Sequence, residues 1–244
     1  MTKPIDRAEM KAQTRKLLQT AQVSPKGMTA LYCACLFLLS LLEALIPGPE
    51  LVSTFLSILT TLAEWILAAG FALYCMDIRR RERSEYAVLF DGFSFTGKII
   101  ALNIVINLFV FLWSMLFVVP GFIAYYRYRF ALYNLCENPG LSVMEALDMS
   151  KRQTQGWKLE LLKLDLSYLG WIVLSLLPAL YVDGRLYLQV LSDPSVLLTA
   201  SSSLTEIIVC GMWSLAVSLF FLPNYQCVNL DYFDAAKAAV SGGQ

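Results

Sequence analysis

Residues 116–140 read LFVVPGFIAYYRYRFALYNLCENPG, and the path of this stretch decides the fold. It begins as an apolar run typical of a membrane helix, reaches Pro120-Gly121, and then becomes aromatic around Arg127 and Arg129. One interpretation places a surface segment after the glycine. The other places a turn at Pro120-Gly121, followed by a further membrane helix. Charges elsewhere in the chain distinguish the two.

The composition indicates an integral membrane protein. Of the 244 residues, 57% are hydrophobic and 16% are charged, whereas a soluble domain is about half apolar and about a quarter charged. The 19 basic and 19 acidic residues balance, so the chain has no overall positive charge that would favour nucleic acid. We therefore expect a lipid bilayer as its surroundings and no nucleic-acid partner.

Five apolar runs are each long enough to span a hydrocarbon core of about 30 Å as a helix that rises about 1.5 Å per residue. These runs cover 28–46, 51–76, 99–119, 159–180 and 204–222. The polar segments around them are a leader at 1–27, a loop at 181–203 and, after Pro223, a tail at 224–244. The expected fold is all-α: a polytopic membrane helix bundle with short amphipathic cytoplasmic helices.

Lysine and arginine decide the number of crossings, because basic residues near the ends of membrane helices favour the cytoplasm. Residues 1–27 hold six of them, 77–98 hold five and 138–163 hold four, whereas 47–50 hold none. All three basic segments fall on one side if 121–137 crosses as a sixth helix. We therefore predict about six transmembrane helices in a bacterial inner membrane, with both termini in the cytoplasm.

Six crossings place Pro120-Gly121 at an outer turn and the two arginines deep in the membrane. A charge at mid-bilayer costs about 2.5–3.5 kcal/mol on insertion scales, so each arginine needs a polar partner or water. We predict an intramembrane polar cluster, whose members are Glu64, Asn103, Asn107, Arg127, Arg129 and Asp165. Two roles stay open for it: a buried ion pair that fixes helix packing, or a working site.

No residue pattern indicates an enzyme. The chain has no histidine, and it lacks the nucleophile, phosphate-binding and nucleotide-binding motifs. Its six cysteines form no C-x-x-C pair and lie mostly in apolar runs, as expected of small buried side chains. We expect no catalytic residue, no metal and no cofactor.

The sequence RRRER at 79–83 has two interpretations. Its arginines are expected either to contact anionic lipid headgroups or to act only as a topology signal. The predicted headgroup contacts are Arg79, Arg80, Arg81 and Arg83. The leader has two interpretations as well. In one, Lys11, Arg15 and Lys16 face headgroups while its leucines lie on the membrane; in the other, the leader is a basic segment surrounded by water.

The quoted stretch and the residues after it resemble a bacterial integral membrane family, which is catalogued as domain of unknown function 975. The shared features are an apolar run ending in Pro-Gly, a tyrosine, an Asn-Pro turn, a short helix, and an element that contains Leu-Ser and Gly-Trp. The matching residues here are Pro120, Gly121, Tyr125, Asn138, Pro139, Glu145, Ala146, Ser150, Gly156, Leu166, Ser167, Gly170 and Trp171. Two departures are Lys151 between Ser150 and Arg152, and Tyr168 in place of a phenylalanine.

This resemblance implies a multi-spanning membrane fold without an assigned biochemical activity. The chain is also distantly similar to the membrane domain of some glycerophosphodiester phosphodiesterases, which hints at lipid-related work. The first hypothesis is therefore a non-enzymatic membrane protein that interacts with lipid or assists a membrane-protein partner. The second is a small-solute or anion carrier with a mid-membrane site at Arg127 and Arg129. The third is an intramembrane enzyme that uses Glu64 and Asp165.

Overall fold

The computed structural model describes residues 7–46, 49–80, 82, 84–193, 195 and 203–242. Within these residues every regular element is a helix, which confirms the all-α prediction. In chain order they are α1 (Arg7–Gln19), α2 (Pro25–Leu45), α3 (Glu50–Arg80), the 3-10 helix η1 (Tyr86–Phe95), α4 (Thr96–Leu116), α5 (Val118–Tyr128), α6 (Ala131–Glu137), α7 (Val143–Gln153), α8 (Lys158–Ser192) and α10 (Leu204–Ser241).

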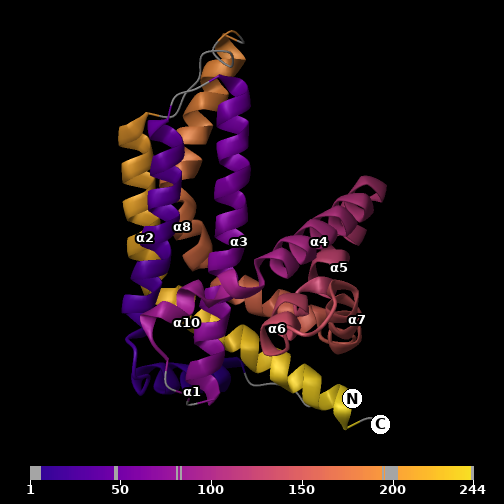
Figure 1. Ribbon diagram of the computed structural model, residues 1–244. Helices are drawn as coiled ribbons and strands as arrows, with labels where there is room; N and C mark the ends of the chain where they lie inside the picture. Colours follow the sequence, from indigo (N-terminus) through magenta and orange to yellow (C-terminus); the bar gives the residue numbers. More distant parts are fainter. Residues whose placement is uncertain are drawn as a thin grey trace.

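Upright helices form one part of the molecule: α2, α3, α8 and the first half of α10 (Figure 1). α2 packs against α3 and α10, and α8 packs against α10. Large apolar side chains cover the outside of this group, where Leu51 is 84% exposed and Phe55 is 62% exposed. Soluble monomers rarely expose so much apolar surface, so the helices indicate a membrane protein.

Five helical segments of the described chain are long and apolar enough to cross a membrane. They are Pro25–Leu45, Glu50–Arg80, Tyr86–Leu116, Lys158–Ser192 and Leu204–Ser241. Five of the predicted spans therefore correspond to long apolar helices, and the sixth does not.

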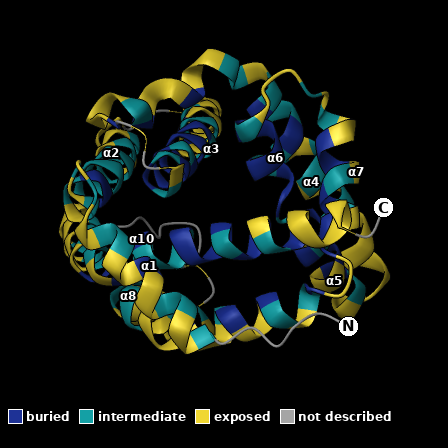
Figure 2. Ribbon diagram, turned by 90° about the horizontal axis from the view of Figure 1, so that it is seen from below, coloured by how far each residue is buried: buried dark blue, intermediate teal, exposed yellow. Residues whose placement is uncertain are grey.

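The buried core lies at the lower end, where the second half of α3 meets η1, α6 and the second half of α10. Its largest fully buried side chains include Phe71 and Tyr74 of α3, Phe130 before α6, and Tyr232 and Phe233 of α10. Figure 2 shows α10 and α1 crossing this end below the upright helices. Here the chain packs as a soluble protein does, with its aromatic side chains inside.

The predicted sixth span at 121–137 is not one continuous helix. The segment forms two short helices, α5 with 11 residues and α6 with 7, and they are separated at Arg129-Phe130. Eleven residues rise only about 17 Å, which is too short for a hydrocarbon core of about 30 Å. α5 instead packs along α4 as a hairpin that leans away from the upright helices (Figure 1).

The turn of this hairpin lies at Phe117 rather than at Pro120-Gly121. Phe117 is extended (φ −161°, ψ 153°), and α5 begins at the next residue. Pro120 is the third residue of α5, where its missing N–H is harmless because the first N–H groups of a helix have no internal acceptor. Gly121 lets α5 approach α4 closely, since a Cβ there would lie 2.1 Å from Ser114 Oγ.

Two helices run past their predicted ends. α8 contains Pro178 and continues through most of the predicted loop to Ser192. α10 contains Pro223 and continues to Ser241, so the predicted polar tail is mainly a packed helix. A long helix tolerates an internal proline with a bend when neighbouring groups hold both halves. Figure 1 shows the two halves of α10 pointing in different directions.

Candidate functional site

Arg129 lies at the break between α5 and α6, and its side chain reaches α8. Its guanidinium group binds the Asp165 carboxylate twice, Nη1 to Oδ2 at 2.6 Å and Nη2 to Oδ1 at 2.8 Å. The Arg129 side chain is only 9% exposed. Two parallel contacts of this kind make a strong and specific ion pair, and burial strengthens the attraction further.

Two tyrosines and an asparagine complete the hydrogen bonding of this pair. The Tyr126 hydroxyl donates to Asp165 Oδ2 at 2.8 Å, and the Tyr225 hydroxyl donates to Asp165 Oδ1 at 2.9 Å. Arg129 Nη2 donates to the Tyr225 hydroxyl at 2.7 Å and to Asn229 Oδ1 at 2.8 Å. Each carboxylate oxygen thus accepts two hydrogen bonds. We call these five residues the Arg129 centre.

The local sequence explains how the Arg129 centre is assembled. Tyr126 precedes Arg129 by three residues, so both side chains leave α5 on one side. Tyr225 and Asn229 are four residues apart on α10, and the Asn229 amide donates to the Tyr225 carbonyl at 2.9 Å. The Arg129 guanidinium lies 5.6 Å from the Tyr126 ring centroid and 5.9 Å from that of Tyr225. The centre therefore joins α5, α8 and α10.

Side chains of α7 satisfy the backbone at the helix break beside Arg129. The Phe130 N–H donates to Ser150 Oγ at 3.2 Å, and Ser150 Oγ donates to the Arg127 carbonyl at 2.9 Å. Ser150 is fully buried, so these backbone groups have no access to bulk water. The helix break is therefore stable, because the backbone groups that lack partners within α5 and α6 form hydrogen bonds with side chains of α7.

Only two of the six predicted cluster residues, Arg129 and Asp165, belong to the Arg129 centre. Asn103 and Asn107 donate to carbonyls of their own helix α4, those of Ile99 and Asn103, at 2.9 Å each. These amides are satisfied locally, as polar side chains inside helices often are.

Glu64 and Arg127 also lie outside the Arg129 centre. Glu64 is exposed on α3, and among the described residues it has no ion-pair partner. Arg127 is two residues from Arg129, so its side chain leaves the helix on another side. Of the predicted cluster, the structure brings Arg129 and Asp165 together and places the other four residues outside the Arg129 centre.

The predicted headgroup contacts at 79–83 have a different role where the structure describes them. Arg79 binds Asp231 at 2.8 Å and Asp234 at 2.7 Å, and Arg80 binds Glu137 at 3.1 Å. Their guanidinium groups join α3 to α10 and α6, and the predicted lipid contact stays a prediction. Arg81 and Arg83 lie outside the described residues.

A family match covers the whole Arg129 centre. Residues 116–239 match the family described as "Protein of unknown function (DUF975)". The chain belongs to the DUF975 family. The comparisons match no curated protein and no solved structure. The family resemblance seen in the sequence is thereby confirmed, and the similarity to phosphodiesterase membrane domains stays a prediction.

Sequence reasoning missed the α10 members of this DUF975 site. Tyr225 and Asn229 lie in the predicted polar tail, because Pro223 predicts a helix end. The available signal was the four-residue spacing of Tyr225 and Asn229 in a segment that is otherwise rich in apolar residues. Within the described part of the chain, no group of three or more acidic or cysteine side chains is arranged to hold a metal ion.

Proposed function

We propose that this DUF975 protein is a non-enzymatic inner-membrane protein that binds anionic lipid at its cytoplasmic face. The proposal rests on a difference between the buried and the exposed basic side chains of the protein. The buried Arg129 is fully paired with Asp165, whereas the exposed Arg15 and Lys26 at the lower end form no ion pair among the described residues. Unpaired cations beside a membrane attract anionic headgroups.

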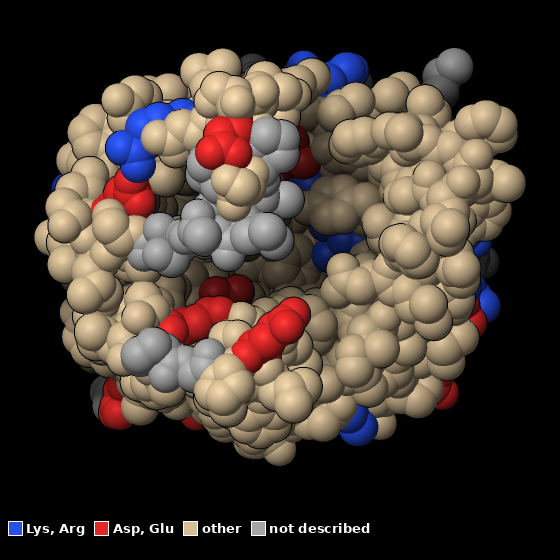
Figure 3. All heavy atoms as spheres, turned by 90° about the horizontal axis from the view of Figure 1, so that it is seen from above, with Lys and Arg blue, Asp and Glu red and all other residues tan. Residues whose placement is uncertain are grey.

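The distribution of charge supports a cytoplasmic lower end. The basic leader and α7 lie there, whereas the upper helix ends carry Glu50, Asp193 and Glu206. Figure 3 shows acidic side chains around a hollow in the upper face. On this proposal α2, α3, α8 and α10 cross the membrane, and the α4–α5 hairpin enters it and returns to the cytoplasmic side.

The exposed tip of the α4–α5 hairpin fits this topology. Met115, Phe117 and Val118 are each about 70% exposed and form an apolar end with no charged residue from Leu116 to Tyr126. Such a tip is stable in the hydrocarbon region and unfavourable in water. In this topology the basic residues of α7 lie on the cytoplasmic side, although α5 is too short to cross the membrane.

The carrier hypothesis is less well supported by the Arg129 centre. An incoming anion would have to replace Asp165 on the guanidinium group, and separating a buried ion pair costs about 3–5 kcal/mol. The enzyme hypothesis needs two carboxylates at one accessible place. Asp165 already accepts four hydrogen bonds, and Glu64 is exposed on another helix without a contact to it.

Reconstitution in defined lipid tests the proposed function. The thermal unfolding midpoint of the full chain is measured in phosphatidylcholine vesicles with and without phosphatidylglycerol, and retained lipid is identified after purification. We expect phosphatidylglycerol to raise the midpoint and to be retained. Equal midpoints with no retained anionic lipid would contradict the proposal. A stoichiometric membrane protein found instead of lipid would favour the accessory role with a protein partner.

A further inference from the structure

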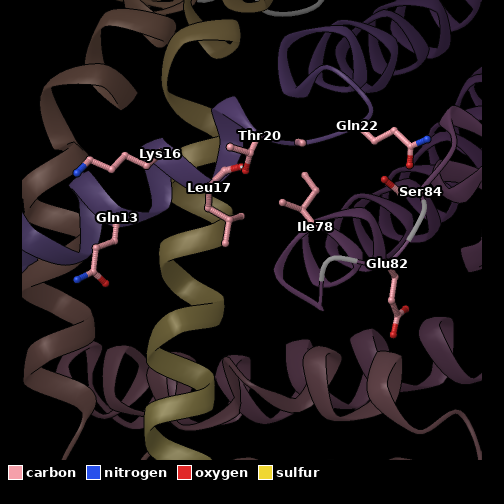
Figure 4. Close-up of a pocket in the computed structure, with 9 residues that line it drawn as sticks. Gln13, Lys16, Leu17, Thr20, Gln22, Ile78, Glu82 and Ser84 are labelled. Carbon is pink, nitrogen blue, oxygen red and sulfur yellow. The ribbon is translucent and has the colours of Figure 1, made fainter.

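Two cavities of similar size flank α1 and differ in chemistry. The one facing α3 has a volume of about 630 Å³ and is shown in Figure 4. It is lined mainly by polar side chains, and its charges are mixed, with Lys16 on one side and Glu82 on the other. The second, of about 580 Å³, faces α8 and α10 and contains Arg15 and Lys26 but no acidic residue.

The second cavity has an aromatic wall. Trp171 of α8 stacks on Phe221 and Phe220 of α10, with ring centroids 6.2 Å and 6.5 Å apart and planes within 16°. Lys26 Nζ lies 5.6 Å from the Phe220 ring centroid. Phe220 is 67% exposed, so the wall continues onto the outer apolar surface. Aromatic rings beside cations at the end of a membrane helix are typical of the bilayer interface.

Specific contacts hold α1 against this cavity. Lys11 Nζ donates to Ser167 Oγ at 2.7 Å and lies 4.0 Å from the Tyr168 ring centroid. The Asn224 amide donates to the Lys11 carbonyl at 3.3 Å. Burial, together with the nearby charge of Arg7, lowers the pKa of Lys11. α1 is therefore fixed in register on α8 and α10, with Arg15 one turn further along the same helix.

We infer that the cavity between α1, α2, α8 and α10 binds one anionic phospholipid, with its phosphate between Arg15 and Lys26 and its acyl chains along Trp171 and Phe220. This inference rests on the proposed function and identifies the site at which the anionic lipid binds. Two cations without an acidic neighbour suit a phosphate group. An aromatic wall that opens onto the membrane surface suits a chain of methylene groups, which a soluble phosphate compound lacks.

The test compares two double variants of the full chain that remove the same charge. R15Q/K26Q changes the cavity, and K16Q/R152Q changes exposed cations on the other side of α1 and on α7. Binding of phosphatidylglycerol to detergent-solubilised protein is measured by native mass spectrometry, with phosphatidylcholine and glycerol 3-phosphate as separate arms. Circular dichroism confirms that each variant is folded.

We expect R15Q/K26Q to weaken phosphatidylglycerol binding about thirtyfold, since each basic residue near an anionic surface contributes about a factor of five. K16Q/R152Q should bind it as the unmodified chain does. Equal weakening in both variants would overturn the site and leave general lipid attraction, and thus the proposed function, intact. If the unmodified chain does not prefer phosphatidylglycerol, both proposals fail. Equal binding of glycerol 3-phosphate would assign the cavity to a soluble phosphate compound.

Discussion

The Arg129 centre and the cavity that contains Arg15 and Lys26 both place cations beside aromatic rings, but only the Arg129 centre pairs its cation with a carboxylate. Arg129 is buried and bonded to Asp165, Tyr225 and Asn229. Arg15 and Lys26 are exposed and have no carboxylate partner among the described residues. A buried charge must find its partners within the protein, whereas an exposed one is free to find them outside. The first arrangement therefore stabilises the fold, and the second is suited to a ligand.

The largest expected effect comes from Arg129→Ala. It leaves the Asp165 carboxylate, whose side chain is only 20% exposed, without its counterion, which destabilises a folded protein by up to about 3–5 kcal/mol. The free energy of unfolding is measured in detergent micelles by denaturant titration. Arg127→Ala is the matched control: it removes the same kind of side chain two residues away, where no ion pair forms among the described residues, and should change stability by less than about 0.5 kcal/mol. Equal losses for both variants would refute the special role of Arg129.

A second variant tests whether the stability of the Arg129 centre depends on its two charges. Arg129→Met combined with Asp165→Leu removes both charges and keeps much of the apolar volume. The double variant should lose about 2 kcal/mol less than the sum of the two single variants, because neither charge is left alone. A double-mutant cycle measures this coupling. Strictly additive losses would mean that the two side chains stabilise the protein independently.

The sequence predicts Arg129 and Asp165 as two members of a six-residue cluster, but it shows neither which members bind each other nor how deep the chain lies around them. A charge in an apolar run requires a partner, and several carboxylates and amides of the chain meet that requirement equally well in the sequence. The loop charges required the basic residues of α7 to lie on the same side as the leader. The positive-inside rule predicts on which side of the membrane a basic segment lies. It does not predict how deeply the preceding segment enters the membrane, so the short α4–α5 hairpin satisfies the rule as well as a full crossing does.

Proline was the other source of error. The pair Pro120-Gly121 predicts a turn, but Pro120 lies in the first turn of α5, a position that accepts proline readily. Pro223 predicts a helix end, but Tyr232 and Phe233 beyond it are fully buried and hold the second half of α10 in place. A proline inside a helix costs a few kcal/mol, and the tertiary packing of two large aromatic side chains outweighs this cost.

A smaller effect is expected at the helix break that positions Arg129. Ser150→Ala removes the hydroxyl that accepts the Phe130 N–H and donates to the Arg127 carbonyl. Leaving buried polar groups unsatisfied destabilises by about 1–3 kcal/mol. The same denaturant titration measures the loss. Ser142→Ala, which removes the exposed N-cap of the same helix, is the control for a general effect on α7 and should cost about 1 kcal/mol.

The smallest expected effect on stability is that of R15Q/K26Q, which makes it the sharpest contrast with Arg129→Ala. Both side chains are exposed, and neither forms an ion pair among the described residues, so their removal in detergent without anionic lipid should change the free energy of unfolding by less than about 0.5 kcal/mol. Phosphatidylglycerol should then raise the unfolding midpoint of the unmodified chain more than that of the variant, because a ligand stabilises the state that binds it. A large loss of stability in the absence of lipid would mean that these cations, like Arg129, serve the fold.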